Sequence, residues 1–186
     1  MRFSSPLYIV CLALDIQLRG RTPLFVANHS LVDTLCSMPK PQLIETRERY
    51  TVFGSITTRW KDNDVYGHVN NAVYNSWMDT AVTEFFRQGE PGLPHTRMIP
   101  FGVETRLTFH RSIAHPDEVE TGLRVERIGN KSVRCGVGIF SRGETEAAAW
   151  GHMIHAWVDR ETKQSVTIPD EVRKGLESAL MKETEQ

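Results

Sequence analysis

One stretch of the chain joins a strand-like segment to a helix-like segment, and it reads RWKDNDVYGHVNNAVY over residues 59–74. The segment before it, from Tyr50 to Trp60, has the alternation of a strand, with Val52, Ile56 and Trp60 on one face. The turn itself holds two carboxylates, a histidine, a glycine and two asparagines, and it opens directly into an apolar helix pattern. Such a turn can activate water and stabilise a developing oxyanion, because the first N–H groups of a helix lack internal partners.

The pattern after the turn predicts a long helix that is largely surrounded by other structure. Apolar residues recur as pairs every four positions over residues 73–86, which is a wider stripe than a surface helix needs. Asn70 or Asn71 can cap the start of this helix, and Gly89 with Pro91 ends it.

Four further strand patterns follow the helix and are joined by short turns. They predict an α+β fold with an antiparallel sheet that curls around one long central helix. Residues 169–180 predict a short amphipathic helix at the end of the chain. The alternating sets that we expect in the four strands are Ile99, Phe101, Val103, Thr105, Leu107 and Phe109; Val119, Thr121, Leu123 and Val125; Val133, Cys135, Val137 and Ile139; and Trp150, His152, Ile154, Ala156 and Val158.

The turn and the start of the helix carry a motif that resembles the signature of a known protein family. Asp62-x-Asp64-x-x-Gly67-His68-Val69-Asn70-Asn71-x-x-Tyr74-x-x-Trp77 resembles the signature of the 4-hydroxybenzoyl-CoA thioesterase family. The resemblance covers roughly Thr51 to Pro169, and it implies the hotdog fold. It also implies hydrolysis of an acyl-CoA thioester to a free carboxylic acid and CoA, a role in fatty acid metabolism, and a homodimer or homotetramer. No cofactor is expected.

The resemblance assigns the chemistry to three positions. The second aspartate of the family's motif is the catalytic carboxylate, and that position is Asp64; it acts either as general base or as nucleophile, and the residues leave both routes open. His68 matches a catalytic histidine of the plant acyl-carrier-protein thioesterases, although Tyr66 stands where those enzymes carry an asparagine. The family binds the oxyanion with the backbone at about Asn71. The alternative for Asp64 and both asparagines is simple capping of the turn and the helix.

The substrate-binding residues that we predict lie in two turns. Gly67 suits a positive φ or a close approach of the thioester to the backbone, and Asp62 stabilises the same turn. The hairpin that ends with Lys131 and Ser132 offers donors for the phosphates of CoA, with a solvated charged turn as the alternative. The full predicted set is Tyr66, Gly67, Asn70, Lys131 and Ser132. The aromatic side chains that line either an acyl pocket or the core are Tyr66, Tyr74, Trp77 and Phe101.

Other acidic and histidine side chains are weaker candidates for catalysis or metal binding. Asp79 and Glu84 on the helix match a second hotdog lineage that places its carboxylate there, but a solvated or ion-paired helix face is the simpler interpretation. His152 and His155 are three apart in a strand, so their side chains point to opposite faces and cannot readily share a metal ion. We predict no metal site.

Composition bounds the remaining possibilities. The chain has 186 residues and a formal net charge of −1, which argues against a nucleic-acid partner. No apolar run is long enough to span a membrane, and three scattered cysteines form neither a disulfide framework nor a zinc motif.

The first part of the chain is expected to lie outside the folded domain that the rest of the chain forms. We expect residues 1–46 to be an extension, either dispensable, targeting or an accessory element, and residues 47–186 to be a single hotdog thioesterase domain. A cytoplasmic protein is the first expectation, and a mitochondrial one the alternative if residues 1–37 form a presequence. The competing functions are a hotdog hydratase or dehydratase of enoyl thioesters and a non-catalytic module that binds acyl thioesters.

Overall fold

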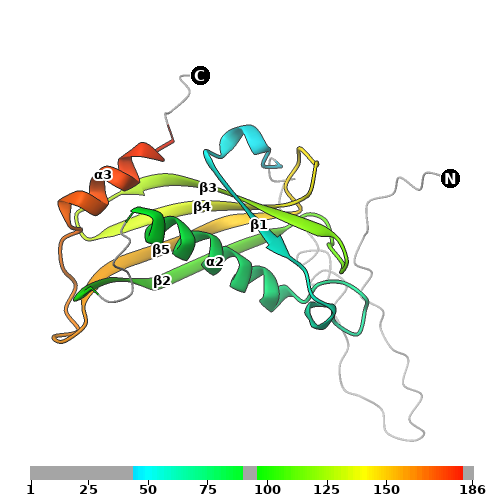
Figure 1. Ribbon diagram of the computed structural model, residues 1–186, viewed down its shortest axis with the longest axis horizontal. Helices are drawn as coiled ribbons and strands as arrows, with labels where there is room; N and C mark the ends of the chain where they lie inside the picture. Colours follow the sequence, from blue (N-terminus) through cyan, green and yellow to red (C-terminus); the bar gives the residue numbers. More distant parts are fainter. Residues whose placement is uncertain (1–43, 90–95, 182–186) are drawn as a thin grey trace, which may run out of the picture. The chain divides into compact units, whose positions relative to one another are not determined.

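A computed structural model describes residues 44–89 and 96–181 of the chain. These residues form a five-stranded antiparallel sheet in the order β1-β3-β4-β5-β2, with helix α2 against one face (Figure 1). This arrangement confirms the predicted α+β layout and the order of its elements. The bounds are η1 Arg47–Arg49, β1 Val52–Thr57, η2 Trp60–Asp62, α2 Asn71–Gly89, β2 Met98–Phe109, β3 Glu118–Ile128, β4 Ser132–Ser141, β5 Ala149–Asp159 and α3 Asp170–Ser178, where η marks a 3-10 helix.

The core lies between α2 and the inner face of the sheet. The helix buries Tyr74, Trp77, Met78, Val82 and Phe86, which recur at helical spacing as the sequence predicts. The strands contribute alternate residues to the same core, because successive side chains in a strand point to opposite faces. They include Val119, Leu123, Val125, Val133, Cys135, Val137, Ile139, Ala149, Met153 and Trp157.

The first strand ends earlier than the sequence pattern suggests. β1 stops at Thr57, and Trp60 lies in the η2 turn with 82% of its surface exposed, so its predicted place on the strand face is wrong. The cause is local: the Asp62 carboxylate accepts a hydrogen bond from the backbone N–H of Arg59 at 2.8 Å and closes the turn. The strand ladder therefore gives way to a 3-10 helix before residue 60.

The last strand forms where the sequence predicts it, but the alternating set named for it is not the set that faces α2. The core-facing side chains of β5 are Ala149, Met153 and Trp157, and not the set that begins with Trp150. The outer face of the sheet is covered as well, because Trp150 packs against a second small cluster of Tyr50, Phe140 and Ala147. With both faces apolar, the period-two pattern does not distinguish them.

The segment from residue 44 to 50 covers part of this outer face. The buried guanidinium of Arg124 donates to Glu45 at 2.8 Å and to Glu126 at 2.7 Å, and it lies 4.7 Å from the ring centre of Tyr50. A buried charge needs such partners to offset its lost hydration. Glu45 is therefore held by the sheet. Residues 1–43 of the predicted extension over residues 1–46 fall outside the described residues, so that extension stays a prediction. No helix in the described part of the chain is long and apolar enough to cross a membrane.

Candidate active site

The turn between η2 and α2 is held by the Asp64 carboxylate. Its Oδ1 accepts the backbone N–H of Tyr66 at 2.8 Å and, more weakly, that of His68 at 3.5 Å. Gly67 adopts a φ of +81°, the left-handed conformation that the sequence suggests for a glycine here. Asp64 thus caps its own turn, which is the alternative that the sequence left open for this residue, but it uses only one carboxylate oxygen to do so. Its Oδ2 makes no hydrogen bond with any described residue, which leaves it available for a ligand or water.

Asp62 stabilises the same turn from below the surface. Its side chain is 2% exposed and accepts hydrogen bonds from the backbone and guanidinium of Arg59. Burial acts to raise the pKa of Asp62, but the Arg59 hydrogen bonds outweigh it and lower the pKa below its usual value. The predicted structural role of Asp62 is confirmed by these contacts.

The start of α2 leaves one backbone donor unused. The side-chain oxygen of Asn70 accepts the N–H of Ala72 at 2.9 Å, which is the capping role that the sequence predicts. The N–H of Asn71, the first residue of α2, has no hydrogen-bond partner among the described residues. An unused N–H at a helix start carries partial positive charge and can stabilise an oxyanion.

The loop between β2 and β3 fixes the turn in place. The N–H of Val69 donates to Ile113 O at 2.8 Å, and the N–H of Ile113 donates in turn to the hydroxyl of Tyr74 at 3.0 Å. The N–H of His115 donates to the side chain of Asn63 at 2.9 Å. Tyr74 is thus a core residue that anchors the turn. Of the two roles that the sequence left open for it, lining an acyl pocket or packing in the core, the structure supports the second.

The surroundings of Asp64 are unusually apolar for an exposed turn. Trp60, Val65 and Tyr66 are 82%, 93% and 81% exposed, and His68 and Asn71 are exposed as well. Grouped apolar side chains on a soluble protein mark a surface that a partner or ligand covers. The turn therefore exposes a surface that a ligand or a partner can cover.

The predicted residues Lys131 and Ser132 lie at the opposite end of the sheet. Thr57, just before the turn, pairs with Glu118 at the start of β3, whereas Lys131 follows the far end of the same strand. Eleven residues of strand span about 35 Å at roughly 3.3 Å per residue. Lys131 donates to Ser165 O at 3.0 Å. Within one chain these residues do not share a site with Asp64.

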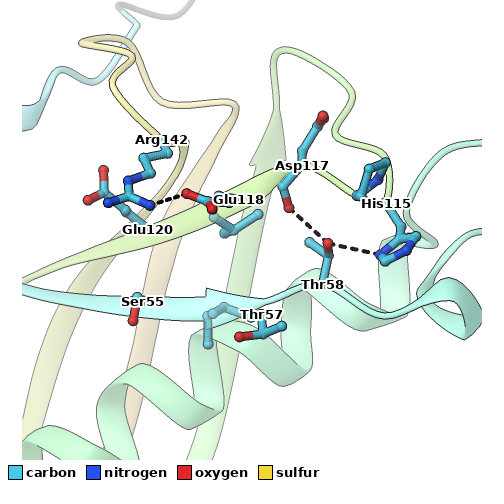
Figure 2. A pocket seen from close by; sticks show the side chains of 11 residues that line it. Ser55, Thr57, Thr58, His115, Asp117, Glu118, Glu120 and Arg142 are labelled. Carbon is cyan, nitrogen blue, oxygen red and sulfur yellow. Dashed lines mark hydrogen bonds and ion pairs between the residues drawn. The ribbon is translucent and has the colours of Figure 1, made fainter.

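A cavity of about 460 Å³ lies beside the turn (Figure 2). The hydroxyl of Thr58 donates to Asp117 O at 2.8 Å and lies 3.2 Å from Nδ1 of His115. Carboxylates outnumber the one guanidinium of the lining, that of Arg142, which is itself paired with Glu118. This charge balance is unfavourable for the phosphates of CoA. The lining is Ser55, Ile56, Thr57, Thr58, His115, Pro116, Asp117, Glu118, Val119, Glu120 and Arg142.

The two histidines of β5 point to opposite faces, as predicted. His152 accepts a hydrogen bond from Arg134 at Nδ1, so its Nε2–H donates to Glu104 at 2.8 Å on the outer face. His155 faces α2, with its ring edge-on to Phe86. Within residues 44–89 and 96–181, no group of three or more His, Cys, Asp or Glu side chains is arranged to hold a metal ion. Glu84 is ion-paired with Arg87 at 2.8 Å, whereas Asp79 lines a second cavity next to His155.

Comparison with known proteins identifies the class to which this chain belongs. The family model of the thioesterase-like superfamily matches residues 58–176, which include the turn, α2 and the whole sheet from β2 onward. The chain therefore belongs to the thioesterase-like superfamily, and it is a thioester hydrolase with the hotdog fold. No match was found among curated proteins.

Solved structures support the same assignment. The PA5185 protein from Pseudomonas aeruginosa is 36% identical, with a TM-score of 0.73 over 77% of this chain and 100% of that one. A Thermus thermophilus thioesterase, solved with coenzyme A and zinc, is 27% identical, with a TM-score of 0.62 over 71% of this chain and 96% of its own. A gentisyl-coenzyme A thioesterase, BH1999, is 21% identical with a TM-score of 0.61 over 67% of this chain and 99% of its own, and it shares the fold.

Proposed function

We propose that this protein is an acyl-CoA thioesterase that releases a free carboxylic acid and CoA. The observation that carries the proposal is a pair of groups that make no hydrogen bond with a described residue, Oδ2 of Asp64 in the turn and the N–H of Asn71 at the start of α2. A base and an oxyanion donor are what the hydrolysis of a thioester requires. The similar Thermus thermophilus enzyme was solved with coenzyme A, which supports CoA as the carrier.

The reaction that we infer proceeds in two steps. A water oxygen attacks the thioester carbonyl carbon while Asp64 takes a proton from the water, and the carbonyl oxygen becomes an oxyanion bound by the N–H of Asn71. The carbon–sulfur bond then breaks, the CoA thiolate leaves and takes the proton back from Asp64, and the carboxylic acid, which keeps the second hydrogen of the water, is released. His68 donates a hydrogen bond to the carbonyl in the same step. Direct attack by Asp64 to give a mixed anhydride is the second route, and ¹⁸O incorporation into the Asp64 carboxylate from labelled water would reveal it.

We also propose a homodimer, or a homotetramer built from such dimers, because β2 leaves an edge of the sheet uncovered. β2 is the last strand in the sheet order, and Phe101 and Val103 on it are each 58% exposed. Met98 and Phe109 at its two ends are 40% and 45% exposed. A long apolar edge strand invites pairing with a second copy of the same strand. Two copies related by a two-fold axis would pair their β2 strands antiparallel and extend the sheet.

This pairing would complete the site from two subunits. Phe109, at the end of β2, packs on Tyr74 near the start of α2, with ring centres 5.3 Å apart. Antiparallel pairing would bring the Phe109 end of the partner's β2 strand next to Ile99 and Gly102 at the start of β2. The partner's Asp64 turn would then meet the second cavity and the end of the sheet that carries Lys131. Lys131 and Ser132 of one subunit would contact the CoA phosphates, while Tyr66, Gly67 and Asn70 of the other would contact the thioester arm.

The test is release of free thiol from acetyl-, medium-chain, long-chain and aryl-CoA esters, by the unmodified protein and by Asp64→Asn. Asparagine keeps the Oδ1 acceptor for the N–H of Tyr66 and removes only the base. We expect kcat to fall by roughly 10²- to 10⁴-fold with an unchanged melting temperature. Turnover that survives the substitution would remove Asp64 from the mechanism. Hydration of an enoyl-CoA, or binding without turnover of any ester, would replace the proposed function by one of the two alternatives.

A further inference from the structure

The second cavity lies between α2 and the start of β2, and its volume is about 280 Å³. Two sides of it are apolar, formed by Phe86 of α2 and by Ile99 and Pro100 of β2. Its size is just below that of pockets that enclose a drug-sized ligand, so it suits a compact group. The lining is Asp79, Thr83, Phe86, Arg87, Ile99, Pro100, Gly102, His155 and Arg160.

The imidazole of His155 is the unusual feature of this cavity. The residue is 5% exposed, and its buried Nδ1 has no hydrogen-bond partner among the described residues. Nε2 makes no hydrogen bond with a described residue either, and it lies 3.6 Å from the point where a Cβ on residue 102 would be. Because residue 102 is glycine, the imidazole remains open to the cavity. Buried polar side chains nearly always have partners, so an imidazole in a cavity wall that no described residue bonds points to a ligand.

The charge state of this imidazole restricts the ligand. Burial lowers the pKa of His155, and the neighbouring Asp79 carboxylate only partly opposes this effect. His155 is therefore neutral near pH 7, with one N–H donor and one nitrogen acceptor. A hydroxyl or carbonyl oxygen is the natural partner for such a ring. The two cations of the lining are less suited to select a ligand, because Arg87 is already paired with Glu84 and Arg160 is exposed.

We propose that this cavity receives the acyl group of the substrate and that His155 selects acyl groups that carry a hydroxyl or carbonyl substituent. The inference rests on the proposed thioesterase function and on the proposed dimer, in which the partner's Asp64 turn meets this cavity, and it names the substrate class: a compact, oxygen-substituted acyl group. The ring of Phe86, at 5.2 Å and 85° to the imidazole, holds His155 in this orientation. The signal in the sequence was Gly102, since a glycine inside a strand often marks the close approach of a ligand.

The test compares matched pairs of CoA esters that differ by one oxygen, namely butanoyl with 3-hydroxybutanoyl and phenylacetyl with 4-hydroxyphenylacetyl. We expect the unmodified protein to prefer the oxygenated member of a pair in kcat/KM by about tenfold or more. His155→Leu should abolish the preference by slowing the oxygenated ester, and His155→Gln should restore part of it. The matched control is His110→Leu, the same substitution at an exposed position outside the cavity, which should leave the preference intact.

A second variant and a second measurement keep the result interpretable. Gly102→Ala places a methyl group at ordinary contact distance from the imidazole without a clash, so this variant should fold and reduce the preference partly. Binding of non-hydrolysable thioether analogues of the same pairs separates selection from chemistry. Tighter binding of the oxygenated analogue without any turnover would keep this inference and overturn the thioesterase proposal. Equal binding within both pairs, or a preference that His155→Leu leaves unchanged, would overturn the inference while hydrolysis stands.

Discussion

The Asp64 turn and the His155 cavity each hold a polar group among apolar side chains, but they are built in opposite ways. In the turn, donors and acceptors within four residues of one another satisfy most of the hydrogen bonds, and the surface is exposed. In the cavity, an imidazole is buried with neither nitrogen bonded to a described residue, among segments far apart in the chain. A local motif can therefore hold its own conformation, whereas a buried group that no described residue bonds indicates that a ligand supplies the missing hydrogen bond.

The largest effect is expected when the Asp64 turn is inactivated in one subunit of the proposed dimer and the His155 cavity is filled in the other. Gly102→Trp would fill the cavity, and Asp64→Asn removes the base, so each homodimer should be inactive. A heterodimer of the two, purified through different tags, retains one complete site if each site takes its turn from one subunit and its cavity from the other. Its activity should then be about half that of the unmodified dimer.

Two controls accompany this heterodimer. Dimers in which both subunits carry Asp64→Asn, with the same two tags, should stay inactive. A heterodimer that also stays inactive, while the unmodified protein is a dimer, would show that the turn and the cavity do not act across the interface as we propose.

The two aspartates of the turn should separate stability from chemistry. Asp62→Ala removes a buried carboxylate that accepts hydrogen bonds from Arg59, and we expect the free energy of unfolding to fall by about 1–3 kcal/mol. Asp64→Asn retains the acceptor for the N–H of Tyr66 and should change that free energy by less than about 0.5 kcal/mol. Urea denaturation of both variants measures the difference. Equal losses would mean that Asp64 is a structural residue like its neighbour.

The cavity should also be visible in the pH dependence of stability. The pKa of His155 is lowered in the folded state, so below about pH 6.5 the unfolded chain binds the proton more readily. The free energy of unfolding is therefore not reduced by this group above that pH, and it falls as the pH falls toward the folded-state pKa of His155. His155→Phe should therefore lose less stability than the unmodified protein between about pH 7.5 and about pH 5.5.

The groups that face His155 across the cavity are Asp79, Arg87 and Arg160, and they are unchanged in this variant. His110→Phe, at an exposed position, is the matched control and should follow the unmodified protein. Parallel pH curves for His155→Phe and the unmodified protein would contradict the burial of an unpartnered neutral imidazole.

The smallest effect is expected at the far end of the sheet. Among the described residues, the ammonium of Lys131 donates only to Ser165 O, so Lys131→Ala should leave the fold intact. If this ammonium contacts a CoA phosphate, KM for an acyl-CoA should rise about two- to fivefold with kcat unchanged. Steady-state kinetics with the matching acyl-pantetheine ester, which lacks the nucleotide, provides the control. An equal rise in KM for that ester would exclude the phosphate contact.

The sequence alone predicted the features that depend on near neighbours. The capping asparagine and the apolar pairs predicted α2 within a residue of its observed start, and the positive φ of Gly67 and the structural role of Asp62 also follow from local hydrogen bonds. The motif around Asp64 was enough to indicate the family, because its residues lie together along the chain. It could not show that one oxygen of Asp64 and the N–H of Asn71 remain unused by the described residues.

The features that depend on distant segments could be read only from the folded chain. Trp150 turned outward because residues near Tyr50 cover the other face of the sheet, and Lys131 proved to lie at the opposite end from Asp64. The cavity needs Asp79, Gly102 and His155 together, which no spacing along the chain reveals. A turn is determined by hydrogen bonds that span a few residues, whereas burial is determined by whichever segments fold over a side chain, and that information is spread over the whole sequence.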